Sequence, residues 1–307
     1  MAEIHHLTYG AVNPVVAYII SFLGSLLGLV CTTRARAAPT PGRRARWLVL
    51  AAITIGGAAI WLMHFTAMLG FDVPDSPVRY NPWLTAFSLV IAIATVGVGL
   101  FIVGHGPRTT LRIAGGGLLT GAGVLVMHYT GMAAVRVSGR IEYDPGLVAA
   151  SAVIAVVAAT TALWFTVTIK GWRAIIAAAV IMGIAVCGMH YTGMAAMRVY
   201  LSLPGETPVE GITTSLLIVP ITLLTATALV GVALSALQAM TEEEFTDDYP
   251  SPRAKRAAVW ALNPQERSPV PAWTGRGEPY WGRRGLHERG GAHERHAHVV
   301  SSAGRWG

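Results

Sequence analysis

Long apolar runs separated by short polar segments fill the first 240 residues of the chain. A transmembrane helix needs roughly 20 apolar residues to cross about 30 Å of hydrocarbon, and seven runs are that long. Apart from Arg112 at the edge of the fourth, they contain no Asp, Glu, Lys or Arg. They lie at residues 13–32, 47–70, 83–104, 112–135, 147–169, 174–197 and 213–238. The pattern predicts an all-α fold, a polytopic membrane bundle of about seven transmembrane helices.

The pattern changes near residue 240, which suggests two parts. We expect a membrane domain over 5–240 and a tail over 241–307. The tail begins with acidic residues (Glu242 to Asp248) and continues with Arg, Pro, Gly and His without apolar periodicity. Such a composition buries too little apolar surface to offset the entropy of ordering, so the tail is predicted to be disordered.

Composition and charge favour the membrane interpretation and give it an orientation. Hydrophobic residues make up 53% of the chain and charged residues 13%, whereas soluble domains carry about 25% charged residues. Basic residues gather in alternate loops, which places those loops in the cytoplasm by the positive-inside rule. They are Arg34, Arg36, Arg43, Arg44, Arg46, Arg108, Arg112, Lys170 and Arg173. The sequence therefore predicts a plasma-membrane protein with its N-terminus outside and its C-terminus cytoplasmic, and no nucleic-acid partner.

Three of the runs share a motif. Residues 127–137 read MHYTGMAAVRV, residues 189–199 read MHYTGMAAMRV, and residues 63–68 read MHFTAM. The spacing corresponds to a repeat of two helices with their loops. Because the period holds an even number of spans, the three motifs should lie at similar depth near the outer face.

The motif histidines His64, His128 and His190 are the candidate metal ligands, because an ionisable residue inside a membrane usually has a function. A methionine follows each of them on the same helix face, four residues later. A further methionine directly precedes each one. These residues are Met68, Met132 and Met194, and Met63, Met127 and Met189. Thioether selects soft metals and imidazole suits copper, so the pattern favours copper; haem is the alternative cofactor.

Structural roles compete with metal binding at each of these positions. A single buried histidine is often a hydrogen-bonded packing residue, and methionine is a common core filler. The aromatic residues that follow the histidines, Phe65, Tyr129 and Tyr191, lie either beside the ligands or at the membrane interface. The motif threonines are expected to bond to the preceding helical turn; they are Thr66, Thr130 and Thr192.

With these motifs, residues 5–240 resemble the MHYT domain, a bacterial integral membrane sensor module. The motif histidines and their flanking methionines match the family positions, whereas Phe65 replaces the family tyrosine. The resemblance implies copper near the outer face and the sensing of a diatomic gas such as O2, CO or NO. Family members often continue into cyclic-di-GMP or kinase output domains, but the tail has no GGDEF-like or EAL-like string.

We therefore expect a membrane sensor without catalytic residues, whose partners are the lipid bilayer, a diatomic gas and a cytoplasmic signalling protein. Copper transport or storage is one alternative. Against transport, we expect the inner halves of the spans to offer no polar groups along a path. A haem or copper oxidoreductase is another, although the spans hold no further acid or base for proton delivery. A scaffold with packing histidines is the last.

Overall fold

The computed structural model describes residue 8, residues 10–106, 108–202 and 209–214, and some of the residues from 216 to 234. The predicted tail and its disorder lie outside the described residues. Within the described part, six helices are long and apolar enough to cross a membrane. The chain is therefore a multi-pass membrane protein, as the runs of apolar residues predict.

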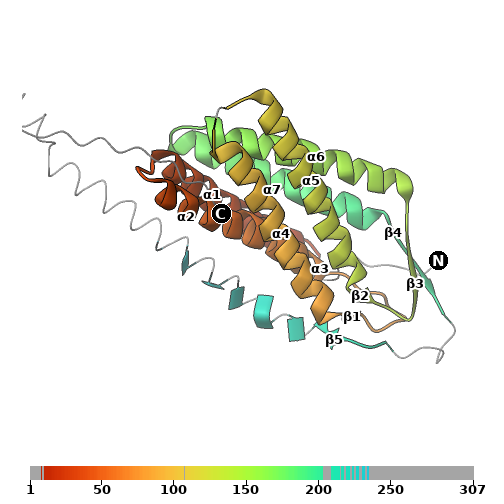
Figure 1. Ribbon diagram of the computed structural model, residues 1–307. Helices are drawn as coiled ribbons and strands as arrows, with labels where there is room; N and C mark the ends of the chain where they lie inside the picture. The colour runs from red at the N-terminus through yellow and green to blue at the C-terminus, as the bar shows by residue number, and fades with distance from the viewer. Residues whose placement is uncertain are drawn as a thin grey trace, which may run out of the picture. The chain divides into compact units, whose positions relative to one another are not determined.

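The first six predicted spans correspond to six helices (Figure 1). The second is continuous but has three parts: α2, a π-helix η1, and α3. The bounds are α1 Val12–Ala37, α2 Pro41–Ala52, η1 Ile53–Leu62, α3 Met63–Met68, α4 Pro82–Gly104, α5 Thr110–Ala133, α6 Pro145–Thr168 and α7 Trp172–Ala195. In the seventh run, the residues described between 214 and 234 are helical.

Consecutive helices pack against one another from α4 to α7, and α1 closes the bundle by packing against η1 and α7. Glycines allow the closest approaches. A Cβ added at Gly24 would lie 2.6 Å from the backbone nitrogen of Ala59, and one at Gly121 would lie 2.6 Å from Val156 Cα. Small residues therefore bring these helices together.

Five short strands, which the sequence analysis did not predict, join the helices at one end of the bundle (Figure 1). β1 pairs with β2 and β5, and β3 pairs with β4, all antiparallel. Their bounds are β1 Arg79–Tyr80, β2 Val135–Arg136, β3 Gly139–Tyr143, β4 Met197–Leu201 and β5 Ile212–Thr213. We call this end the strand end, and the opposite end, where the basic loops lie, the basic end.

The strand end holds a structural repeat that matches the motif repeat. Asn81 and Asp144 each precede a proline and cap the next helix by accepting hydrogen bonds from its first backbone N–H groups. The backbone N–H of Asn81 donates to the Ala134 carbonyl, and that of Asp144 donates to the Ala196 carbonyl, both at 2.8 Å. Each cap thereby fixes the end of a motif helix to the start of a neighbouring helix.

Replacing Gly121 with alanine should destabilise the bundle by about 1–3 kcal/mol, because the new methyl group meets backbone atoms of α6 that cannot rotate away. Thermal unfolding of the full chain in detergent measures the effect. Gly115→Ala on the same helix is the matched control, since a Cβ there meets nothing within 4 Å. Equal midpoints for the two variants would contradict the close packing.

Candidate metal centre

The three motif histidines meet at one point inside the bundle. His64 Nδ1 lies 2.9 Å from His190 Nδ1 and 3.2 Å from His128 Nδ1. One ring nitrogen from each of the three lies within 4.8 Å of the others. The ring centroids are 4.8–5.3 Å apart, with interplanar angles of 78–86°. The imidazoles of three separate repeats therefore form one compact cluster.

The cluster is fully buried and comes from three helices, with His64 on α3, His128 on α5 and His190 on α7. Their exposed fractions are 1%, 0% and 1%. In the first repeat the motif helix is preceded by the π-helix η1. Because π-helical hydrogen bonds skip five residues instead of four, η1 changes the direction in which α3 presents His64. Segments of this kind are frequent at functional sites.

The nitrogen positions suit a single metal ion. An ion with bonds of about 2.0 Å and trigonal or tetrahedral geometry holds its ligand nitrogens about 3.3–3.5 Å apart, slightly more than the two Nδ1 separations here. The Nδ1 atoms that face one another would be the ligand atoms for such an ion. The buried Nε2 atoms of His64 and His128 lie against Gly131 and Gly193 instead, without a hydrogen-bond partner among the described residues. The donor set therefore fits a metal, while the role of these histidines as ligands stays a prediction.

Two motif glycines make room for the imidazoles of the preceding repeat. A Cβ added at Gly131 would lie 2.5 Å from His64 Nε2, and one added at Gly193 would overlap His128 Nε2. The second and third motif helices thus each supply a histidine to the cluster and a notch for the ring of the preceding repeat. The motif Met-His-Tyr-Thr-Gly includes the glycine for a steric reason.

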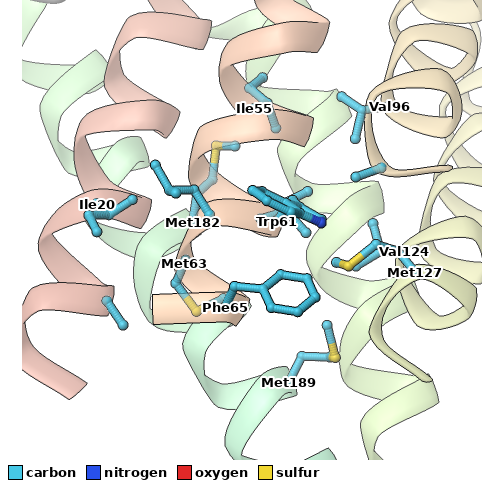
Figure 2. Packing of buried hydrophobic residues seen from close by; sticks show 14 of the residues in the cluster. Ile20, Ile55, Trp61, Met63, Phe65, Val96, Val124, Met127, Met182 and Met189 are labelled. Atoms are coloured by element: carbon cyan, nitrogen blue, oxygen red, sulfur yellow. The ribbon is translucent and has the colours of Figure 1, made fainter. Parts of the chain in front are cut away.

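The candidate methionines are all buried, in two layers about the histidines. One layer precedes the histidines by one residue, and the other follows by four residues, about 6 Å along the helix axis. Figure 2 shows Met63, Met127 and Met189, which come from three different helices around Trp61 and Phe65. Met68, Met132 and Met194 are exposed by 0%, 0% and 3%. Coordination through sulfur stays a prediction for all six.

The aromatic residue after each histidine packs edge-on against it. The centroid separations are 4.8 Å for Phe65, 4.9 Å for Tyr129 and 5.0 Å for Tyr191. These rings therefore lie beside the histidines that they follow.

The threonines behave unequally. Thr192 donates to the Gly188 carbonyl at 2.7 Å, as expected for a bond to the preceding turn. The hydroxyl of Thr66 is buried without a partner in the described part of the chain, so for that residue the expectation is wrong.

The sequence analysis missed two tyrosines that directly precede the helix caps. Tyr80 is fully buried and donates to the Met68 carbonyl at 3.1 Å, which fixes the end of the first motif helix. Its equivalent, Tyr143, packs edge-on against Tyr129. Burial raises the pKa of Tyr80, and burial together with Tyr129 raises the pKa of Tyr143 to about 12. Both therefore stay neutral at physiological pH. The repeated strings Tyr-Asn-Pro and Tyr-Asp-Pro were the available signal.

A cavity of about 50 Å³ extends from Met189 towards the basic end. Most of its lining is Ala, Val, Leu and Ile, but Ser25, Thr120 and Thr166 also line it. The expectation that the inner halves hold no polar groups is therefore wrong. Hydroxyls are poor ligands for a soft ion, so these groups do not make a copper path.

Comparison with known proteins agrees with this geometry. The family model MHYT, described as "Bacterial signalling protein N terminal repeat", matches residues 57–116, 121–179 and 183–243. Each match contains one motif histidine. In the structure the repeats are thus three contributors to one cluster.

Two similar relatives come from Pseudomonas aeruginosa. The bifunctional diguanylate cyclase/cyclic di-GMP phosphodiesterase MucR is 39% identical over 62% of this chain and 28% of its own length. The cyclic di-GMP phosphodiesterase NbdA is 33% identical over 66% of this chain and 26% of its own length. The signalling protein YkoW of Bacillus subtilis is 28% identical over 62% of this chain and 24% of its length.

The chain thus spans about a quarter of the length of these curated relatives. No solved structure matches it significantly. The family model covers more than half of the residues in three consecutive copies, and each copy supplies a histidine to the cluster. The chain therefore belongs to the MHYT family of bacterial membrane signalling proteins.

Proposed function

We propose that this chain is a membrane sensor that holds copper at His64, His128 and His190 and responds to a diatomic gas or to redox state. The observation that carries the proposal is the convergence of three imidazoles from three repeats at Nδ1 separations of 2.9 and 3.2 Å. The same contacts are hydrogen bonds between the rings. The burial of all three rings at one point, with buried methionines around them, favours a ligand set over separate packing residues. In the proposed role the region binds and signals, and it does not catalyse.

The chemistry of the surroundings favours copper over other metals. Imidazole suits zinc, iron and copper, whereas thioether favours Cu(I), and two buried methionine layers flank the histidines. The described spans offer no carboxylate near the cluster for calcium or magnesium. Haem is disfavoured because its axial ligands must lie on opposite sides of a macrocycle, whereas these rings contact one another.

A bound copper ion would supply a coordination position for a small ligand such as O2, CO or NO. The protein supplies a buried, preorganised cluster, and the mostly apolar cavity of about 50 Å³ beside Met189 offers space for such a gas close to it. Any signal requires that the gas bind more tightly in one of two bundle arrangements. Since the rings occupy glycine notches, a shift of one imidazole would press on the neighbouring motif helix.

The positive-inside rule places the basic end in the cytoplasm, so in this proposal the cluster lies near the outer face. The relatives MucR and NbdA are named as cyclic di-GMP enzymes. We therefore assign the output of this sensor to cyclic di-GMP turnover, through a signalling protein that contacts the cytoplasmic side. This output is distinct from transport, which would change the copper content of the cell.

Replacing His128 with glutamine should remove most of the copper from the full chain purified in detergent, because one of three converging ligands is lost. Elemental analysis measures the metal. His105→Gln is the matched control, since His105 is partly exposed at the basic end and lies outside the cluster. A wild-type chain that carries no copper from copper-sufficient cells would refute the proposal, as would equal copper in both variants.

Replacing Gly193 with alanine should lower copper affinity by about tenfold, the scale of effects seen when a ligand's supporting groups change. The new methyl group would overlap the ring of His128 and displace it. Competition with a Cu(I) chelator measures the affinity. Gly188→Ala on the same helix should leave the affinity unchanged, because a Cβ there meets nothing within 4 Å. If both variants bind alike, the glycine notch does not position the ligand.

A further inference from the structure

The described loops at the basic end of the bundle are rich in positive charge. The segments 33–47, 104–113 and 168–174 contain nine Arg and Lys residues and no Asp or Glu. The ion pairs described in the structure, Arg140–Glu142 and Arg198–Asp144, both lie at the strand end. A surface of this kind attracts anions, and its geometry decides whether it also binds them at a specific position.

Three of these arginines surround one cavity. Arg36 from the last turn of α1, Arg44 from α2 and Arg108 from the loop after α4 line a space of about 150 Å³. Apolar residues of α4 and α6 form much of the remaining wall. This volume holds several water molecules, and therefore a phosphate-sized anion. Among the described residues, no carboxylate lines it.

Hydrogen bonds fix the position of Arg36 through one nitrogen of its guanidinium group, while another nitrogen has no described partner. Its Nη2 donates to the carbonyl of Ile169 and to Thr33 Oγ1, the latter at 3.1 Å. Its Nη1 is buried and has no hydrogen-bond partner among the described residues. A buried, unpaired donor on a charged group is costly unless a ligand satisfies it. Arg44 is likewise fixed, through Nε to the Ala35 carbonyl at 3.3 Å.

We propose that Arg36, Arg44 and Arg108 form a binding site for a phosphate group at the basic end of the bundle. Guanidinium groups recognise phosphate through paired N–H···O bonds, and three of them around one cavity can satisfy one phosphate from several sides. The site goes beyond the metal centre, shares no residue with it and does not depend on copper.

The position of this arginine site along the membrane normal favours the headgroup of an anionic phospholipid as the source of the phosphate. Arg36 and Arg44 lie at the ends of membrane-spanning helices, the level at which lipid phosphates lie. Basic pockets between helix ends are suited to such headgroups. The apolar residues in the wall provide contact for the glycerol and upper acyl chain. A free phosphate from the aqueous phase has the same chemistry without this apolar part.

The test uses the delipidated full chain in detergent and its thermal unfolding midpoint. Dihexanoyl phosphatidylglycerol should stabilise the chain saturably, at concentrations at least tenfold below those needed for inorganic phosphate. Sodium chloride at equal ionic strength should not stabilise it. Arg108→Gln should raise the half-saturating concentration about tenfold, and because Arg108 is exposed and makes no described hydrogen bond, the variant should fold.

Arg173→Gln is the matched control, since it removes the same charge from the same end but lines no part of the cavity. Arg36→Lys keeps the positive charge but removes the paired N–H donors of the guanidinium group, and it should also weaken phosphate binding. Stabilisation by inorganic phosphate as strong as that by the lipid would support the site and assign it to a free phosphate. Absence of saturable stabilisation by either, or equal effects of Arg108→Gln and Arg173→Gln, would overturn it.

Discussion

The burial of three imidazoles against one another is the constraint on which the rest of the bundle depends. Polar groups inside a membrane protein are costly unless they are satisfied, and here each ring lies in a space that only the other repeats can provide. His64 needs the glycine of the second repeat, and His128 needs that of the third. The second and third repeats therefore each complete the surroundings of the histidine in the repeat before them.

The first repeat departs from the other two in ways that bear on the same constraint. By the order of the repeats, His190 should face position 67, where alanine replaces the motif glycine. The helix that carries position 67 also contains the π-helix η1, whereas α5 and α7 are regular. We interpret η1 as the adjustment that fits this helix to the cluster. Trp61 fixes its end by donating to Ser88 Oγ at 2.9 Å.

The sequence was sufficient for the spans and for the common depth of the histidines. A period of two helices places all copies of a motif at one depth, which the meeting of His64, His128 and His190 requires, although the spacing does not say which face of each helix points inward. The π-helix was not predictable, because such segments are selected by tertiary packing and have no strong composition of their own. The Tyr-Asn-Pro and Tyr-Asp-Pro caps could be predicted from the sequence, because Asn and Asp are favoured helix N-cap residues.

The cavity lined by arginines could not be predicted from the sequence. Arg36, Arg44 and Arg108 come from three segments whose positive charges all have an adequate explanation in membrane orientation. Only the arrangement of the side chains distinguishes basic residues that line a cavity from basic residues that mark the cytoplasmic side of the membrane. Leu100 and Thr166 line both this cavity and the one that reaches Met189. The two ends of the bundle thus share packed residues, so a change in helix packing at the histidine cluster would reach the basic end through a short series of contacts.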